Sequence, residues 1–108
     1  MGGIDDHIWR LILRLNSKDV LPVYGLRRNS RHYHLITAIN HSIGLLISGS
    51  YGNIAVLLNR AYKELEVRDF VETDYITTCK EYLASLTTYL VENKLLTYEE
   101  QELLRGRI

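Results

Sequence analysis

The chain has 108 residues, of which 46% are hydrophobic and 24% charged, as is typical of one soluble globular domain. Thirteen basic and thirteen acidic residues give a formal net charge of zero, which excludes nucleic-acid binding through overall charge. A single cysteine excludes an internal disulfide, and with it the disulfide-stapled class of secreted domains. We therefore expect a single domain over residues 1–108.

The charges are unevenly distributed along the chain. Six Lys/Arg and three Asp/Glu precede Gly52, which gives +3, whereas seven Lys/Arg and ten Asp/Glu follow it, which gives −3. Such a layout favours head-to-tail packing or binding of a partner on one side. The alternative is that a small domain scatters its charges unevenly by chance.

The first expected helix covers residues 6–16. Asp5 and Asp6 stand at its start, where acidic groups stabilise the positive end of a helix. Apolar residues then recur at steps of three and four and form one stripe: Ile8, Leu11, Ile12 and Leu15. Residues 17–29 contain Pro22, and we expect them to form a loop or a short extended piece packed on the helices.

A helical hairpin over residues 30–70 is the predicted centre of the fold. Its helices, about 30–48 and 53–71, meet at Gly49-Ser50-Tyr51-Gly52, where glycines permit a tight turn. Asn53 is the expected N-cap of the second helix. The apolar stripes of the hairpin are Leu35, Ile36, Ile39, Ile43, Leu46 and Ile47, followed by Ile54, Leu57, Leu58, Ala61, Leu65 and Phe70.

Two further helices complete the expected bundle. One covers residues 74–94, begins at Thr73 or Asp74, and carries the core stripe Ile76, Cys79, Leu83, Leu86 and Leu90. It either follows a break at Glu72-Thr73 or continues the preceding helix as one bent rod. A short last helix, residues 98–105, opens with the capping-box pattern Thr97-Tyr98-Glu99-Glu100. The fold class is therefore all-α, with four main helices and a short C-terminal one.

Three tyrosines form the predicted protein interface. Tyr75, Tyr82 and Tyr89 recur every seven residues, so they lie on one side of the helix beside its core stripe. Tyrosine is enriched at interfaces because its ring gives contact area while its hydroxyl can still be hydrogen-bonded. We predict that these rings are a surface contact row; the alternative is that they only cover the boundary of the bundle.

A basic cluster forms the second candidate site: Arg27, Arg28, Arg31, His32 and His34. Arg27 with His32, or Arg28 with His34, has the arginine–histidine spacing that resembles the motif of the HEPN family of small helical ribonucleases. That resemblance implies metal-independent RNA cleavage, in which the arginine holds the phosphate and the histidine handles the proton or orients the 2′-hydroxyl. Without catalysis, the same cluster could hold RNA phosphates.

A second resemblance covers the hairpin and carries an RNA-binding expectation. Part of the chain is similar to the four-helix accessory proteins of diversity-generating retroelements, which are oligomeric bundles that bind RNA. The residues that carry it are Leu45-Leu46-Ile47, Tyr51, Leu57-Leu58, Ala61, Leu65-Glu66, Arg68 and Phe70. It implies an RNA-binding accessory bundle.

Other chemistry is not expected. His34 and His41 stand two helical turns apart and no His-Glu-x-x-His or paired-cysteine motif occurs, so we expect no metal and no cofactor. Cys79 falls on an apolar stripe, where a buried thiol is usually inert. We expect no DNA binding, because the helix over residues 74–94, which would have to enter the DNA groove, offers Lys80 as its only base before its last residue. No segment suits a bilayer or a signal peptide, so the expected location is cytoplasmic.

The expected function is that of a non-enzymatic interaction or adaptor protein. It would act by protein–protein contact, as an oligomer or as a small subunit or inhibitor of a larger complex. The tyrosine row would supply the contact and the basic cluster a charged anchor. The two alternatives are the RNA-binding accessory bundle and the HEPN-like ribonuclease.

Overall fold

The computed structural model describes residues 5–22, 27–28 and 30–107. Its helical elements, in chain order, are α1 (Asp6–Leu15), α2 (Tyr33–Ser48), the 3₁₀ turn η2 (Tyr51–Asn53), α3 (Ile54–Val67), α4 (Asp74–Glu92) and α5 (Tyr98–Leu103). The described residues contain no strand. The prediction of an all-α bundle with four main helices and a short C-terminal one is therefore confirmed.

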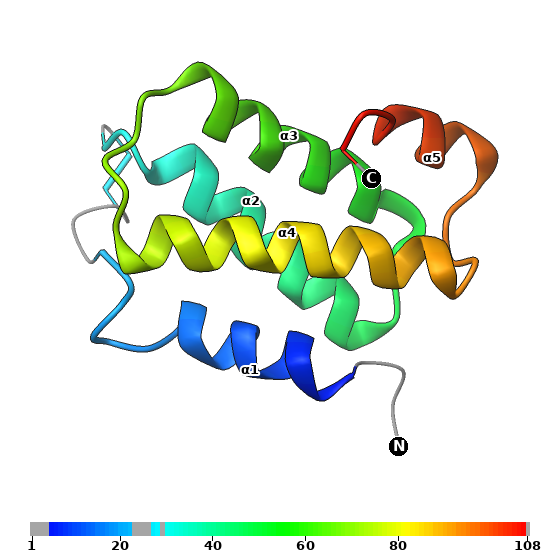
Figure 1. The fold of residues 1–108 in the computed structure, drawn as a ribbon, viewed down its shortest axis with the longest axis horizontal. Helices are drawn as coiled ribbons and strands as arrows, with labels where there is room; N and C mark the ends of the chain where they lie inside the picture. The colour runs from blue at the N-terminus through cyan, green and yellow to red at the C-terminus, as the bar shows by residue number, and fades with distance from the viewer. Residues whose placement is uncertain (1–4, 23–26, 29, 108) are drawn as a thin grey trace.

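The helices are arranged around α4, the longest of them (Figure 1). Helices α2 and α3 fold back on each other as the predicted hairpin, and α4 packs against α3. Helix α1 packs along α4, and α5 packs on α3. Because α4 has neighbours on more than one side, a wider arc of its surface is buried than that of a helix at the edge.

Local sequence signals account for most helix starts. The side chain of Asp5 accepts a hydrogen bond from the Ile8 amide at 2.9 Å, and Thr73 accepts one from the Ile76 amide at 3.3 Å. Both hydrogen bonds of the predicted capping box between Thr97 and Glu100 are present. Asn53 is the N-cap residue of α3 as predicted, but it makes no side-chain capping bond, because α3 begins directly from η2, whose Tyr51 carbonyl accepts the Ile54 amide.

The hairpin helices are shorter than predicted. Helix α2 begins at Tyr33 and ends as expected at Gly49, whose φ of 75° is the left-handed conformation that glycine adopts at little cost. Helix α3 ends at Val67, so α3 and α4 are two separate helices. A tertiary contact accounts for the early end of α3. Phe70 lies outside the helix and packs its ring on that of His32, with the ring centroids 4.8 Å apart.

The buried side chains form one hydrophobic core, and the predicted stripe of α4 lies entirely within it. Three hairpin positions differ from the prediction, since Ile47 is 56% exposed and Leu65 and Phe70 are only partly buried. In the segment before α2, Val20 and Leu21 pack against the core, which agrees with the expected packed loop. The rest of that prediction falls on residues 23–26 and 29, which lie outside the described residues.

Candidate functional site

The predicted tyrosine row is wrong for two of its three members. The rings of Tyr75 and Tyr82 are 1% and 0% exposed, so neither can contact a partner at the surface. The seven-residue spacing does place them on one side of α4, but the other helices cover that side where Tyr75 and Tyr82 lie. The other helices bury more of α4 than its aliphatic stripe, and the hydroxyl of Tyr82 meets Ser42 of α2.

The two buried tyrosines differ in how their hydroxyl groups are satisfied. The Tyr82 hydroxyl lies 2.9 Å from the hydroxyl of Ser42, which itself donates to the Ile39 carbonyl at 2.7 Å. The Tyr75 hydroxyl makes no hydrogen bond of ordinary geometry among the described residues, and the thiol of Cys79 is its polar neighbour. Burial raises the pKa of both phenols and raises the pKa of the Cys79 thiol to about 12, so the thiol is not a nucleophile.

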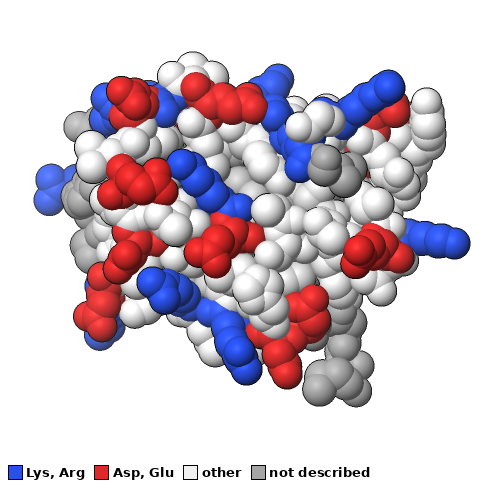
Figure 2. Space-filling view, viewed as in Figure 1, with Lys and Arg blue, Asp and Glu red and all other residues white. Residues whose placement is uncertain are grey.

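Tyr89 is the one member of the row that lies in a surface depression. We call this depression the α1–α4 groove; it has a volume of about 530 Å³ and is lined by Asp5, Ala84, Ser85, Thr88, Tyr89, Glu92 and Asn93. Figure 2 shows that the surface over the C-terminal half of α4 is largely uncharged, with acidic side chains at its borders. Burial raises the pKa of Tyr89, and the nearby Tyr51 and Asp5 raise it further.

The basic cluster lies where α2 begins, at the end of the bundle opposite the groove. Arg27, Arg28, Arg31 and His34 are exposed, and His32 is half-buried. A second depression of about 220 Å³ borders this cluster and is lined by Arg31, His32, Asp69, Phe70, Val71 and Thr73. Burial lowers the pKa of His32, and the neighbouring Arg31 guanidinium lowers it further.

The structure adds acidic groups to the basic cluster that the local sequence does not contain. The α3–α4 connection, residues 68–73, brings Asp69 into the lining of the depression, and Arg31 donates a hydrogen bond to the Asp69 carbonyl at 3.1 Å. The same connection carries Glu72, whose pKa is lowered by hydrogen bonds from Thr77 and Lys80. The depression is therefore of mixed charge, and a strongly anion-selective pocket is not formed there.

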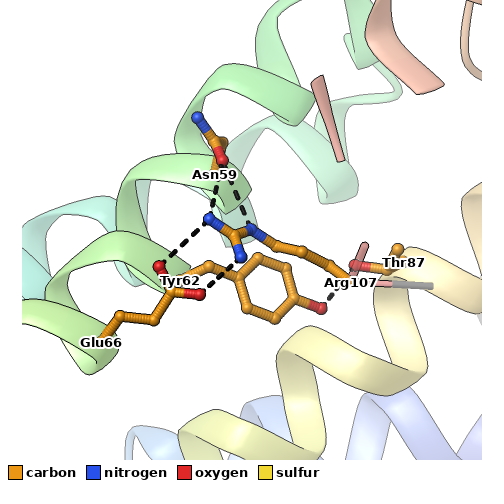
Figure 3. Close-up of polar contacts among 5 residues, drawn as sticks. All are labelled: Asn59, Tyr62, Glu66, Thr87 and Arg107. Carbon is orange, nitrogen blue, oxygen red and sulfur yellow. Dashed lines mark hydrogen bonds and ion pairs between the residues drawn. The ribbon is translucent and has the colours of Figure 1, made fainter. Parts of the chain in front are cut away.

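A polar cluster around Arg107 was not predicted from the sequence (Figure 3). The Arg107 guanidinium donates to Glu66 at 2.6 Å and to the Asn59 side chain at 3.3 Å, and it lies over the Tyr62 ring, 5.0 Å from its centroid. The Tyr62 hydroxyl in turn lies 2.9 Å from the Thr87 hydroxyl. The cluster thus joins the segment after α5 to α3, and α3 to α4.

The Arg107 cluster is a structural contact between distant parts of the chain. Its partners stand 41 and 48 residues before Arg107, so no local motif could reveal it. The hydrogen bonds and the stacked ring occupy the guanidinium, and its side chain is only 17% exposed. Sequence reasoning could at most have noted an arginine beside Gly106, which is a weak signal.

Neither a metal centre nor a membrane span is found in the described part of the chain. Its histidine, cysteine, aspartate and glutamate side chains include no group of three or more placed to hold an ion. None of its helices combines the length and the apolar character that crossing a bilayer requires. Comparison of the chain with models of known families, with curated proteins and with solved structures finds no match.

Proposed function

We propose that this chain is a non-enzymatic interaction module that binds a protein partner in the α1–α4 groove. The observation that carries the proposal is the lining of the groove. Ala84, Ser85 and Thr88 are small, so the backbone of a partner could approach α4 closely, and Tyr89 offers a ring beside them. A tyrosine next to small side chains gives contact area at a low cost in conformational entropy.

The exposed apolar residues of α1 support the same proposal. Trp9 is 43% exposed and Leu13 is 57% exposed, and they stand one helical turn apart on α1, the helix that begins directly after Asp5 of the groove lining. Single exposed apolar residues are common on monomers, but tryptophan is strongly enriched among residues that dominate binding energy. A partner in the groove would find further apolar surface on α1.

The experiment that tests the proposal blocks the groove without disturbing the core. Ala84 is exposed, so Ala84→Arg places a long charged side chain in the groove. The matched control is Glu81→Arg, which makes the same residue at another exposed position of α4 outside the groove lining. Each tagged variant is recovered under native conditions from the cells that normally make the protein, and the mass of its assembly is measured.

We expect wild type and Glu81→Arg to be recovered in an assembly heavier than the 12.6 kDa chain. Ala84→Arg should be recovered at the mass of the chain alone while keeping its helical content. The proposal is wrong if Ala84→Arg retains the wild-type assembly. It is also wrong if all three proteins are recovered as monomers.

RNA binding is a second candidate function, and the exposure of Arg27, Arg28 and Arg31 at one end of the bundle supports it. Replacing all three with glutamine should weaken binding to mixed single-stranded RNA and reduce its salt dependence, because each lost phosphate contact reduces counterion release. Binding that is unchanged in this variant, or absent in wild type, would exclude this function. The HEPN-like alternative further predicts RNA cleavage without added metal that His32→Ala with His34→Ala abolishes.

A further inference from the structure

We propose that the occupant of the α1–α4 groove is the opposite end of a second copy of this chain, so that copies associate head to tail. This inference rests on the proposed function, because it names the partner of the same groove. The inserted surface, here termed the basic end, consists of Arg27, Arg28 and Arg31 with the exposed valines Val67 and Val71.

The basic end combines charge with exposed apolar surface. Val67 and Val71 are each 79% exposed, which makes them the most exposed of the large hydrophobic side chains in the described residues. They flank residues 68–70, and the hydrogen bond from Arg31 to the Asp69 carbonyl holds this segment next to the start of α2. The basic end therefore presents two exposed valines together with three exposed arginines, and arginine and apolar side chains are both common at protein interfaces.

The groove has the complementary composition. Among the described residues, the charged ones that line the groove are Asp5 and Glu92, and both are acidic. Tyr89 and Ala84 supply the apolar part. Opposite charges around apolar contacts fix orientation and raise the association rate more than they raise affinity. The mixed charge of the basic end limits the gain, because Asp69 and Glu72 lie on the same connection.

The two surfaces cannot meet within one molecule. Thr73, the N-cap of α4, lines the depression at the basic end, and Asn93, its C-cap, lines the groove. A 19-residue helix separates them by about 28 Å. Contact between them therefore requires two copies, and a contact of two different surfaces continues into a ring or an open chain of copies.

Charge reversal on each surface gives a direct test with purified protein. One variant carries Arg27→Glu and Arg28→Glu, which makes the basic end acidic. The other carries Asp5→Asn and Glu92→Arg, which makes the groove basic; asparagine at position 5 retains an N-cap for α1. Sedimentation velocity is measured over a range of protein and salt concentrations, and circular dichroism checks that each variant keeps its helical content.

Wild type should gain mass above 12.6 kDa as its concentration rises, and added salt should reverse this gain. Each variant alone should remain at the mass of one chain, because its two surfaces then carry the same sign. An equimolar mixture should associate again, because every basic surface finds an acidic one on the other variant. Two single variants that regain assembly only when mixed would be hard to explain by loss of folding.

Three results would overturn the inference: a wild type that stays monomeric, a mixture of folded variants that does not associate, or an assembly that stops at two copies and ignores both charge reversals. A monomeric purified protein whose cellular assembly is still lost in Ala84→Arg would refute only the head-to-tail contact. In that case the proposed function stands with a different partner. If the purified protein is monomeric and Ala84→Arg has no effect on the assembly recovered from cells, both the head-to-tail contact and the proposed function are refuted.

Discussion

The hydroxyl groups of Ser42 and Tyr82 lie 2.9 Å apart and join α2 to α4 inside the core. The Ser42 hydroxyl donates to the Ile39 carbonyl, so it can only accept the bond from Tyr82. Both residues are at most 1% exposed, and water therefore cannot replace the bond. A tyrosine in this position is part of the fold, which explains why it does not serve as an interface residue.

The first prediction compares the two buried tyrosines. Tyr82→Phe should lower the free energy of unfolding by about 1 kcal/mol, because it removes a buried hydrogen bond while keeping the ring. Tyr75→Phe should be neutral or slightly stabilising, because the hydroxyl that it removes has no ordinary hydrogen-bond partner among the described residues and lies beside the Cys79 thiol. Urea denaturation of both variants measures the difference. Equal losses of unfolding free energy in the two variants would show that the Ser42–Tyr82 hydrogen bond makes no net contribution to stability.

The second prediction concerns the Arg107 cluster. Arg107→Ala should lower the free energy of unfolding by about 1–2 kcal/mol, since it removes a partly buried ion pair, a hydrogen bond to Asn59 and the cation–π contact with Tyr62. Arg107→Lys should recover little of this loss, because lysine lacks the planar group that makes these contacts together.

Arg105 provides the control for that experiment. It pairs with Glu102, but its side chain is 77% exposed, so Arg105→Ala should cost less than about 0.5 kcal/mol. Urea denaturation at low and high salt separates the contributions. If Arg105→Ala and Arg107→Ala destabilise equally, the cluster in Figure 3 does not hold the last helix in place.

The third prediction concerns the core leucines. Leu58, Leu83 and Leu86 are fully buried, so replacing any one with alanine should cost about 2–5 kcal/mol. Leu65 was expected to belong to the same set, but it is only partly buried, and Leu65→Ala should cost less than any of the other three. Thermal or urea denaturation of the four variants ranks their losses of stability. A loss at Leu65 equal to that at Leu58 would contradict the described packing of α3.

The fourth prediction is a pH dependence from His32. The folded protein lowers the pKa of this imidazole below its ordinary value of 6.5, mainly by burial, so the unfolded chain binds the proton more tightly. The resulting contribution to stability is complete above pH 6.5 and is lost as the pH falls below that value towards the lowered pKa. His32→Gln should remove this part of the pH dependence, as measured by urea denaturation between pH 7.5 and pH 5.

His34→Gln is the matched control, because His34 is exposed two residues further along α2. Glu72, on the same connection as Phe70, does not interfere with this window, because the hydrogen bonds from Thr77 and Lys80 lower the pKa of its carboxyl group. A pH profile that is identical in wild type and His32→Gln would refute the role of His32 burial.

The sequence determined the helices because their signals are local. Threonine at positions 73 and 97 and aspartate at position 5 cap the helix that follows, within three residues of the amide that each one accepts. The aliphatic stripe of α4 has the helical period, and any packing of this helix must bury it. The element type, the approximate boundaries and most of the core follow from these short-range interactions alone.

The tertiary structure decided which sides of those helices face water and which distant residues meet. The period of seven places Tyr75, Tyr82 and Tyr89 on one side of α4, but the packing of the other helices around α4 determines that two of them are buried and one lines a groove. The end of α3 depends on the contact of Phe70 with His32, and the position of Arg107 depends on partners more than 40 residues away. Local periodicity carries no information on such pairings, because they depend on the relative placement of separate helices.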